Sequence, residues 1–311
     1  MAEAILFASD IDDPAPWRDV LAKGFPELEF RVWPELGRPE EILYALIWKI
    51  QGGVLGTLPN LRAIFALGAG VDQILVDPAF PRHIPLARLV EAGLAEQMSE
   101  YAIFAALYFH RRMGEYFAQQ SRREWNRLPT IHPAARTVGV MGLGNLGGDA
   151  ARKLSAIGYR TIGWSRTEKH LPGVECFAGP ERQADFLRQS EILINLLPLT
   201  DATRGILGRA LFAQLPDGAC IVHLGRGVHL VEQDLLDGLD TGKLGGAMLD
   251  VFPLEPLPKD HLFWSHPKIV VTPHISTQPI AELARRQVVE NFRRIAAGQS
   301  LIGLVDPDVG Y

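Results

Sequence analysis

Three polar residues with complementary chemistry stand in the second half of the sequence. Arg226, Glu255 and His274 each follow an apolar run that has the length of a β-strand. The planar guanidinium of an arginine can hold a carboxylate and polarise a carbonyl. An imidazole can donate a proton near neutral pH, and a carboxylate beside it fixes its orientation and favours its charged form. We therefore expect Arg226 to bind a keto acid, His274 to be the acid/base and Glu255 to assist it.

Each of the three residues also has an ordinary explanation. An arginine between glycines can be a turn residue, a glutamate between prolines can be a solvated charge, and a histidine after a strand can simply lie on the surface. In an open α/β sheet, however, the carboxyl ends of the strands meet at one edge, and ligands bind there. Because all three residues follow successive predicted strands, their joint occurrence favours a catalytic site over three unrelated loops.

The segment GLGNLG at residues 142–147 carries three glycines with the spacing GxGxxG. It follows an apolar strand pattern and opens a helical one, which is the arrangement of a dinucleotide-binding turn. In such a turn Gly142 makes the sharp bend, Gly144 lets the backbone approach the pyrophosphate, and Gly147 allows the helix to pack closely on the strand. The N–H groups at the start of the helix then bind the phosphates. The alternative is a glycine-rich turn without a ligand, and the flanking strand and helix argue against it.

The next predicted strand ends with GWSRT at residues 163–167, and this ending indicates which dinucleotide binds. An NAD site carries a carboxylate here for the ribose 2′-hydroxyl, whereas an NADP site has an arginine nearby for the 2′-phosphate. The strand does not end in a carboxylate, Arg166 follows it, and Lys169 adds positive charge. We therefore predict a preference for NADP(H) over NAD(H). The alternative is that Arg166 is a solvated loop residue.

The order of apolar and helical segments predicts an α/β protein with two Rossmann-like domains. Residues 98–279 contain strands that alternate with helices, which indicates a doubly wound parallel sheet in the NAD(P)-binding domain. This domain is inserted into a smaller, flavodoxin-like substrate (catalytic) domain formed by residues 1–97 and 280–311. The cofactor domain is expected to hold strands at 137–142, 161–165, 192–196, 219–224, 246–251 and 269–272. Outside it we expect strands at 4–8, 29–33, 63–67 and 85–89, helices at 17–23, 40–46 and 280–297, and one long bridging helix at 96–123.

The composition excludes several classes of protein. With 311 residues, 47% of them hydrophobic and 22% charged, and a net charge of −5, the chain resembles an average soluble protein and not a nucleic-acid-binding one. We expect no signal peptide and no membrane helix, because the first residues lack a basic segment and no apolar run is long enough. Cys176 and Cys220 form no CxxC pair, which favours a reducing, cytoplasmic environment. No metal site is predicted.

The segments GLGNLG, HLGRG, AMLDVFPLEPLP and TPHIS resemble the signatures of the D-2-hydroxyacid dehydrogenase family, and the resemblance covers nearly the whole chain. The further segments FALGAGVD, GWSRT, INLLPLT and LPDGA are similar to those of its members that reduce glyoxylate and hydroxypyruvate. The resemblance implies NADPH-dependent reduction of small 2-keto acids, glyoxylate to glycolate and hydroxypyruvate to D-glycerate. It also implies a homodimer whose interface includes the long helix after residue 98 and the arm Arg122–Leu128.

The resemblance implies the same roles for the three residues at strand ends and adds others. Ala69 and Gly70 would donate backbone N–H groups to the substrate carboxylate, which suits a glycine-bearing loop. Asp250 would face the nicotinamide end of the cofactor. The remaining positions that the resemblance places at the cofactor are Gly142, Gly144, Asn145, Leu146, Gly147, Ser165, Arg166, Thr167, Leu197, Pro198, Leu224 and Gly225.

Two further sequence features concern the substrate and the cofactor. Trp48 and Lys49 follow the apolar run Leu43–Ile47 and are candidates for lining the substrate cleft, the alternative being a buried tryptophan beside a lysine with a covered aliphatic stem. His223 stands where many relatives carry asparagine, so the cofactor contacts near it can differ. Two rival functions stay open: an NAD-preferring dehydrogenase for another 2-hydroxy acid, and a dinucleotide-binding sensor or corepressor.

Overall fold

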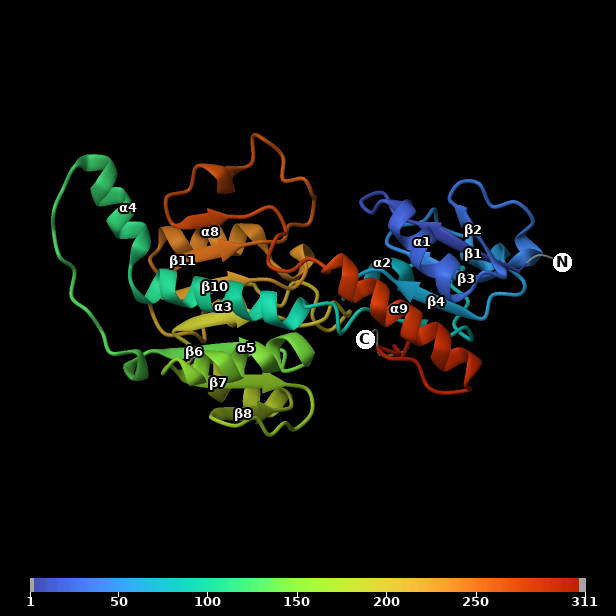
Figure 1. The fold of residues 1–311 in the computed structure, drawn as a ribbon. Helices are drawn as coiled ribbons and strands as arrows, with labels where there is room; N and C mark the ends of the chain where they lie inside the picture. Colours follow the sequence, from blue (N-terminus) through green and yellow to red (C-terminus); the bar gives the residue numbers. More distant parts are fainter. Residues whose placement is uncertain (1–2, 308–311) are drawn as a thin grey trace. The chain divides into compact units, whose positions relative to one another are not determined.

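The computed structural model describes residues 3–307 and forms two compact units (Figure 1). The first unit combines the chain up to Leu94 with the segment that begins at Gln278, and the second unit runs from Ala95 to Thr277. The sequence analysis places these boundaries at 97/98 and 279/280. The second unit is thus an insertion into the first.

The first unit is built on a five-stranded sheet in which all neighbouring strands are parallel. Its strand order, β2-β1-β3-β4-β5, is that of flavodoxin-like folds, as predicted. The aromatic ring of Phe292 packs on this sheet, with its centroid 5.1 Å from that of Phe65. The strands are β1 (Glu3–Ala8), β2 (Leu28–Val32), β3 (Ile42–Ile47), β4 (Ala63–Ala66) and β5 (Leu86–Ala87), and the helices are α1 (Pro14–Gly24), α2 (Asp72–Leu75) and α9 (Ala281–Ala296), with 3₁₀ turns at Pro39–Glu41 and Leu55–Thr57.

The predicted helix at 40–46 is wrong. Pro39–Glu41 form one 3₁₀ turn, and Ile42–Ile47 form β3, which lies between β1 and β4. All six residues of β3 are buried, so this strand is apolar on both faces and lacks the alternation of a half-buried strand. A short continuous apolar run fits a buried strand as well as a helical segment, and periodicity alone does not distinguish the two.

The second unit contains a seven-stranded parallel sheet with the order β12-β11-β10-β9-β6-β7-β8. The chain reverses direction across the sheet between β6 and β9, which is the doubly wound arrangement of a dinucleotide-binding domain. All six predicted strands are present, and β8 is an additional edge strand whose sequence VECFA carries no clear strand pattern. The strands are β6 (Thr137–Met141), β7 (Arg160–Ser165), β8 (Val174–Ala178), β9 (Ile192–Asn195), β10 (Ala219–His223), β11 (Leu244–Leu249) and β12 (Ile269–Val271). The helices are α3 (Leu94–His110), α4 (Met113–Arg122), α5 (Asn145–Ala156), α6 (Gln183–Leu187), α7 (Arg209–Phe212) and α8 (Glu232–Asp240), with 3₁₀ turns at Pro133–Ala135, Pro180–Arg182, Gly227–His229 and Leu262–Trp264.

Buried apolar side chains cover both faces of the seven-stranded sheet. On one face α3 and α5 pack against the central strands, and on the other face α6, α7 and α8 do so. The carboxyl ends of the strands are left to the loops that carry the candidate site residues. No helix among residues 3–307 has the length and hydrophobicity needed to span a membrane.

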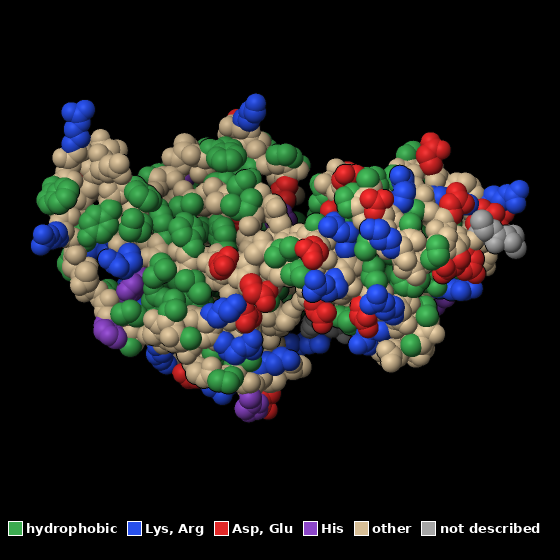
Figure 2. Space-filling model, viewed as in Figure 1, with side chains coloured by type: hydrophobic (Ala, Val, Ile, Leu, Met, Phe, Trp, Pro, Cys, Tyr) green, Lys and Arg blue, Asp and Glu red, His purple; other side chains and the backbone are tan. Residues whose placement is uncertain are grey.

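The single helix predicted at 96–123 is also wrong, because the structure breaks it at Arg112. This residue has a left-handed backbone conformation, with a φ of 57°, between α3 and α4. Its guanidinium binds the Glu115 carboxylate in the next helix through two hydrogen bonds of 2.6 Å. α4 and the extended segment after it project from the second unit (Figure 1). Figure 2 shows hydrophobic side chains gathered over α3 and α4.

Candidate active site

The glycine-rich turn joins β6 to α5, and its three glycines differ in their surroundings. Gly142 has a φ of 97°, and a Cβ on it would lie 2.6 Å from the carbonyl oxygen of Leu196. A Cβ on Gly147 would lie 1.9 Å from the carbonyl oxygen of Gly142, so the helix and the strand approach too closely for any side chain. A Cβ on Gly144, in contrast, would meet nothing within 4 Å. The fold therefore requires Gly142 and Gly147, whereas the open space at Gly144 suits the close approach of a pyrophosphate.

The start of α5 offers hydrogen-bond donors for phosphate groups. The N–H of Gly148 donates to the carbonyl oxygen of Gly144 at 2.8 Å, and this is the first hydrogen bond of the helix. The N–H groups before it have no acceptor inside the helix. Together with the positive end of the helix dipole, these donors form an anion-binding site that fits a dinucleotide.

The turn after β7 has the chemistry expected for a 2′-phosphate. Ser165, at the end of the strand, is buried, and its hydroxyl donates to the carbonyl oxygen of Thr167 at 2.8 Å. Arg166 and Thr167 are exposed. The strand thus ends in a hydroxyl and an arginine, and the carboxylate that would bind a free ribose 2′-hydroxyl is not present at its end.

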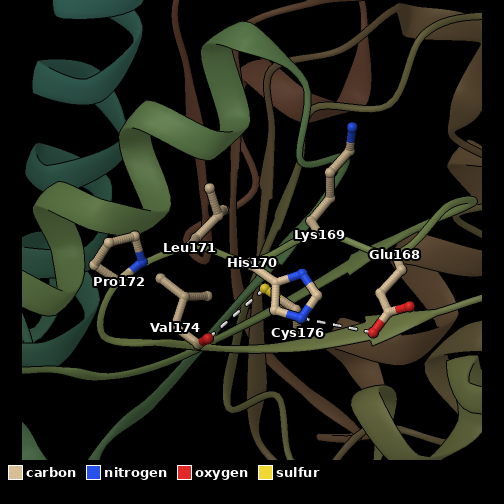
Figure 3. A pocket seen from close by; sticks show the side chains of 7 residues that line it. All are labelled: Glu168, Lys169, His170, Leu171, Pro172, Val174 and Cys176. Atoms are coloured by element: carbon tan, nitrogen blue, oxygen red, sulfur yellow. Dashed lines mark hydrogen bonds and ion pairs between the residues drawn. The ribbon is translucent and has the colours of Figure 1, made fainter.

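Beyond this turn, residues between 168 and 176 line a surface hollow of about 430 Å³ (Figure 3). Glu168, Lys169 and His170 are among the residues that line it. His170 Nε2 lies 3.7 Å from Glu168 Oε1, and both side chains are exposed. Burial raises the pKa of the Cys176 thiol, which makes it a poor nucleophile.

Arg226 lies in a tight turn after β10, and glycines on both sides make room for it. A Cβ on Gly225 would lie 2.9 Å from His229 Nδ1, and a Cβ on Gly227 would lie 1.9 Å from the backbone of Phe252. The Arg226 N–H donates to His229 Nδ1 at 3.1 Å, and its guanidinium donates to the Gly225 carbonyl oxygen at 3.0 Å. The GRG motif is therefore a close-packed turn that fixes the arginine backbone.

Glu255 and His274 lie next to each other in the loops after β11 and β12. His274 Nδ1 is 2.7 Å from Glu255 Oε2, and Glu255 Oε1 accepts a hydrogen bond from the Phe252 N–H at 2.9 Å. Burial raises the pKa of Glu255, but these two hydrogen bonds and the charges of His274 and Arg226 outweigh it, so that the pKa is lowered and the carboxylate stays ionised. Because Nδ1 of His274 is bound to the carboxylate, Nε2 is the atom left to exchange a proton with a substrate.

Asp250 holds the loop that carries His274. The backbone of His274 has a φ of 54°, which residues other than glycine rarely adopt and which is found at functional sites where the surroundings impose it. The buried Asp250 carboxylate accepts hydrogen bonds from the Thr272 hydroxyl at 2.6 Å and from the N–H groups of Ile275 and Ser276 at 2.9 and 2.8 Å. Both carboxylate oxygens are thus engaged by this loop. The contact of Asp250 with a nicotinamide stays a prediction.

A buried polar cluster that the sequence analysis did not identify lies behind the Arg226 turn. Asn195 Nδ2 is 3.2 Å from Nδ1 of His223 and 3.2 Å from Nδ1 of His229, and all three residues are fully buried. The amide has two hydrogens, one for each imidazole, so each imidazole accepts at Nδ1. Burial and the neighbouring His229 lower the pKa of His223 to about 3.

This cluster connects two segments that the sequence places in the site. His229 accepts from the Arg226 N–H through Nδ1, and its Nε2 lies 3.3 Å from the carbonyl oxygen of Pro198. Pro198 belongs to a predicted cofactor segment, whereas Arg226 is the predicted substrate ligand. His229 therefore fixes the distance between the two segments.

In the first unit, Trp48 packs across the loop of residues 68–71. A Cβ on Gly68 would lie 2.4 Å from Cζ3 of Trp48, so the glycine lets the indole lie against the backbone. Lys49 is exposed, and its Nζ lies 3.2 Å from Oδ2 of Asp10, a contact that contributes little to stability at an exposed site. Trp48 thus supports the loop that carries Ala69 and Gly70, and Lys49 pairs with a carboxylate of its own unit.

Comparison with known proteins identifies the family. Residues 103–276 match the NAD-binding domain of the D-isomer specific 2-hydroxyacid dehydrogenases. The chain belongs to this family. It is 42% identical to glyoxylate/hydroxypyruvate reductase A of Serratia proteamaculans and 40% identical to the protein of the same name from Yersinia enterocolitica, in each case over 99% of both chains.

Solved structures of other dehydrogenases share the whole fold. A D-isomer specific 2-hydroxyacid dehydrogenase of Xanthobacter autotrophicus Py2, in complex with NADPH and MES, matches with a TM-score of 0.94 at 37% identity over 100% of both chains. An NADPH-dependent glyoxylate/hydroxypyruvate reductase of Sinorhizobium meliloti, in complex with NADP and sulfate, matches with a TM-score of 0.91 at 36% identity, again over 100% of both chains. The predicted family and fold class are confirmed.

The structure of this dehydrogenase brings together some predicted residues and adds others. It joins Glu255 to His274 directly and holds Arg226 through His229. His229 and Asn195 were missed, although the short distance in sequence from Arg226 to His229 and the polar end of β9 are features that point to them.

Proposed function

We propose that this dehydrogenase uses NADPH to reduce small 2-keto acids, glyoxylate to glycolate and hydroxypyruvate to D-glycerate. The observation that carries the proposal is the hydrogen bond between His274 Nδ1 and the ionised Glu255, with Arg226 close enough to lower the pKa of that carboxyl group. A cation, an acid/base and its carboxylate partner are the groups that reduction of a keto acid needs. The names of the relatives support the choice of glyoxylate and hydroxypyruvate.

Each residue has a distinct task in the proposed reaction. NADPH, when bound, supplies the hydride that is added to C2 of the keto acid. Arg226 binds the substrate carboxylate and carbonyl oxygen, which orients C2 and stabilises the negative charge that develops on that oxygen. His274 holds a proton on Nε2 and donates it to the same oxygen, so that the carbonyl becomes a hydroxyl. Glu255 stabilises the charged imidazole before the transfer and keeps the ring oriented.

We propose NADP(H) over NAD(H) because of the turn after β7. The N–H groups at the start of α5 would bind the pyrophosphate, and Arg166 would pair with the 2′-phosphate. The two similar solved structures, which are complexes with NADPH and with NADP, support this choice.

The experiment that tests the function is a comparison of initial rates of NADPH and NADH oxidation with glyoxylate, hydroxypyruvate and pyruvate. We expect fast oxidation of NADPH with the first two substrates, and a KM for NADPH that rises about 10-fold or more in Arg166→Ala, which loses a charge-assisted contact. Arg160→Ala is the matched control, because Arg160 lies at the other end of β7. Equal or faster rates with NADH would refute the proposed preference for NADP(H). The lack of any oxidation that depends on a keto acid would refute the proposed activity.

We also propose a homodimer formed through α3, α4 and the segment that follows. Phe104, Phe117 and Trp125 are 53%, 54% and 93% exposed, and Leu107 and Ile131 are exposed too. Single exposed apolar side chains are ordinary, but a group of them on one projecting element is typical of an interface. Light scattering should give twice the mass of the chain, and Phe117→Lys should lower it. A wild-type monomer at micromolar concentration would exclude the dimer.

We further propose that the dehydrogenase works in the cytoplasm. Cys176 and Cys220 are both free thiols, as is usual in a reducing compartment. Cell fractionation should recover the protein with cytoplasmic markers, and its recovery outside the cytoplasmic membrane would contradict this location.

A further inference from the structure

The loop of residues 68–71 and Arg88 lie at the same edge of the five-stranded sheet. They follow β4 and β5, which are parallel neighbours, so the segments after these strands meet. The Leu89 N–H donates to the Gly68 carbonyl oxygen at 3.0 Å, and Arg88 Nη1 donates to the Ala69 carbonyl oxygen at 3.1 Å. Two successive carbonyl groups of the loop are therefore turned toward the segment after β5.

These two hydrogen bonds decide where the N–H groups of the loop point. In a trans peptide, the carbonyl and the N–H of the next residue point in opposite directions. Because the carbonyl groups of Gly68 and Ala69 face the β5 side, the N–H groups of Ala69 and Gly70 face away from it. Neither N–H has a hydrogen-bond partner among residues 3–307. Two adjacent donors with one direction form a receptor for an anion.

Arg88 adds a positive charge behind this receptor. Within the described part of the chain, no carboxylate lies within 4.0 Å of its guanidinium, whose hydrogen bond is to the Ala69 carbonyl. Burial lowers the pKa of Arg88, and no neighbouring carboxylate opposes this effect, although an arginine stays charged in any case. A charge that is partly removed from water and not paired has an unfavourable desolvation free energy, and an anion that binds nearby offsets part of it.

We propose that Arg88 is a positioning residue that aims the Ala69 and Gly70 N–H groups and supplies the positive charge that makes this loop select a carboxylate. The guanidinium acts through the peptide: it polarises the Ala69 carbonyl and thereby strengthens the Gly70 N–H on the opposite side as a donor. Its charge also attracts an anion at short range. The inference rests on the proposed function and adds to it a residue that favours anionic keto acids over neutral carbonyl compounds.

Three substitutions separate the charge of Arg88 from its hydrogen bond. Arg88→Lys keeps a charged donor, Arg88→Gln keeps a donor without charge, and Arg88→Met removes both. Glyoxylate kinetics, inhibition by oxalate, NADPH binding and thermal melting are measured for each variant. We expect Arg88→Gln to raise the KM for glyoxylate and the Ki for oxalate about 10-fold, with kcat and NADPH binding unchanged, and Arg88→Lys to stay within about 3-fold of wild type.

Arg62→Gln is the control, because Arg62 lies in the same unit and its side chain is 57% exposed. If Arg88 were only structural, the Lys and Gln variants would behave alike, or kcat, NADPH binding and melting temperature would change together with KM. Either result overturns the proposal, as does an unchanged KM in Arg88→Gln. If the wild-type protein does not reduce glyoxylate, the proposed function is wrong as a whole. If the wild type is active and Arg88→Gln is unaffected, only the proposed role of Arg88 is wrong.

Discussion

The contact between Glu255 and His274 leads to a quantitative prediction for Glu255→Gln. Glu255 Oε2 and His274 Nδ1 are 2.7 Å apart, and the two side chains are 37% and 39% exposed. Unit charges about 4 Å apart attract by about 4 kcal/mol at an effective dielectric constant of about 20 and by about 1 kcal/mol in water. Because this pair is partly exposed, we expect a contribution of about 1–2 kcal/mol, which corresponds to a change in rate of about 10-fold. Glutamine keeps an acceptor for Nδ1, so the variant loses the charge and retains the ring orientation.

The assay is kcat/KM for NADPH oxidation with glyoxylate, measured together with NADPH binding and thermal melting. Glu255→Gln should lower kcat/KM about 10-fold, because the negative charge beside the imidazole is lost, with NADPH binding and melting temperature as in wild type. Glu232→Gln is the matched control, because Glu232 Oε2 lies 3.3 Å from His261 Nε2 in the same unit. A lower melting temperature or weaker NADPH binding alongside the loss of kcat/KM would refute the electrostatic role, and an unchanged kcat/KM would refute any role of Glu255.

Two further predictions concern the glycine turn and the buried cluster. Gly144→Val should keep the wild-type melting temperature, because a Cβ at this position meets nothing within 4 Å, and it should lose NADPH binding, whereas Gly147→Val should destabilise the fold. NADPH binding is measured by fluorescence titration, and binding retained in Gly144→Val would contradict the prediction. The pKa of His223 is about 3 in the folded protein and about 6.5 in the unfolded protein. Above about pH 6.5 the imidazole is neutral in both states and its full contribution to stability is present. Below that pH the unfolded protein binds a proton that the folded protein does not, so the free energy of unfolding falls by up to about 1 kcal/mol per pH unit as the pH approaches 3. The free energy of unfolding, measured in urea between about pH 7 and pH 4, should therefore fall less steeply in His223→Asn than in wild type, and parallel curves would exclude His223 as the responsible group.

Local sequence patterns were sufficient to predict the strands and the glycine turn that carry the candidate site. The glycine turn and the apolar strands before Arg226 and His274 each have a signature within a few residues, and parallel strands bring their carboxyl ends to one edge. The doubly wound sheet of the second unit follows from the alternation of strands and helices, apart from its edge strand β8, which was not predicted.

The features that were missed depend on contacts between distant parts of the chain. β3 is buried on both faces, so its pattern fits a helix as well as a strand until its neighbours are known. Asn195 meets His223 and His229 across 28 and 34 residues of sequence, so local features mark the single residues but do not show that the three form a cluster. The same holds for Arg88. Its proposed role depends on the hydrogen bond to the Ala69 carbonyl on a neighbouring loop, whereas the sequence around it predicts only the end of an ordinary strand.

In the proposed reaction, His274 donates the proton during NADPH-dependent reduction of glyoxylate. The most direct test measures NADPH oxidation and glycolate formation by wild type and by His274→Ala, with NADPH binding measured for both. We expect one glycolate formed per NADPH consumed by wild type, and a loss of kcat of about 100-fold or more in His274→Ala with NADPH binding retained. A variant that turns over near the wild-type rate, or a wild type whose NADPH oxidation does not depend on glyoxylate, would contradict it.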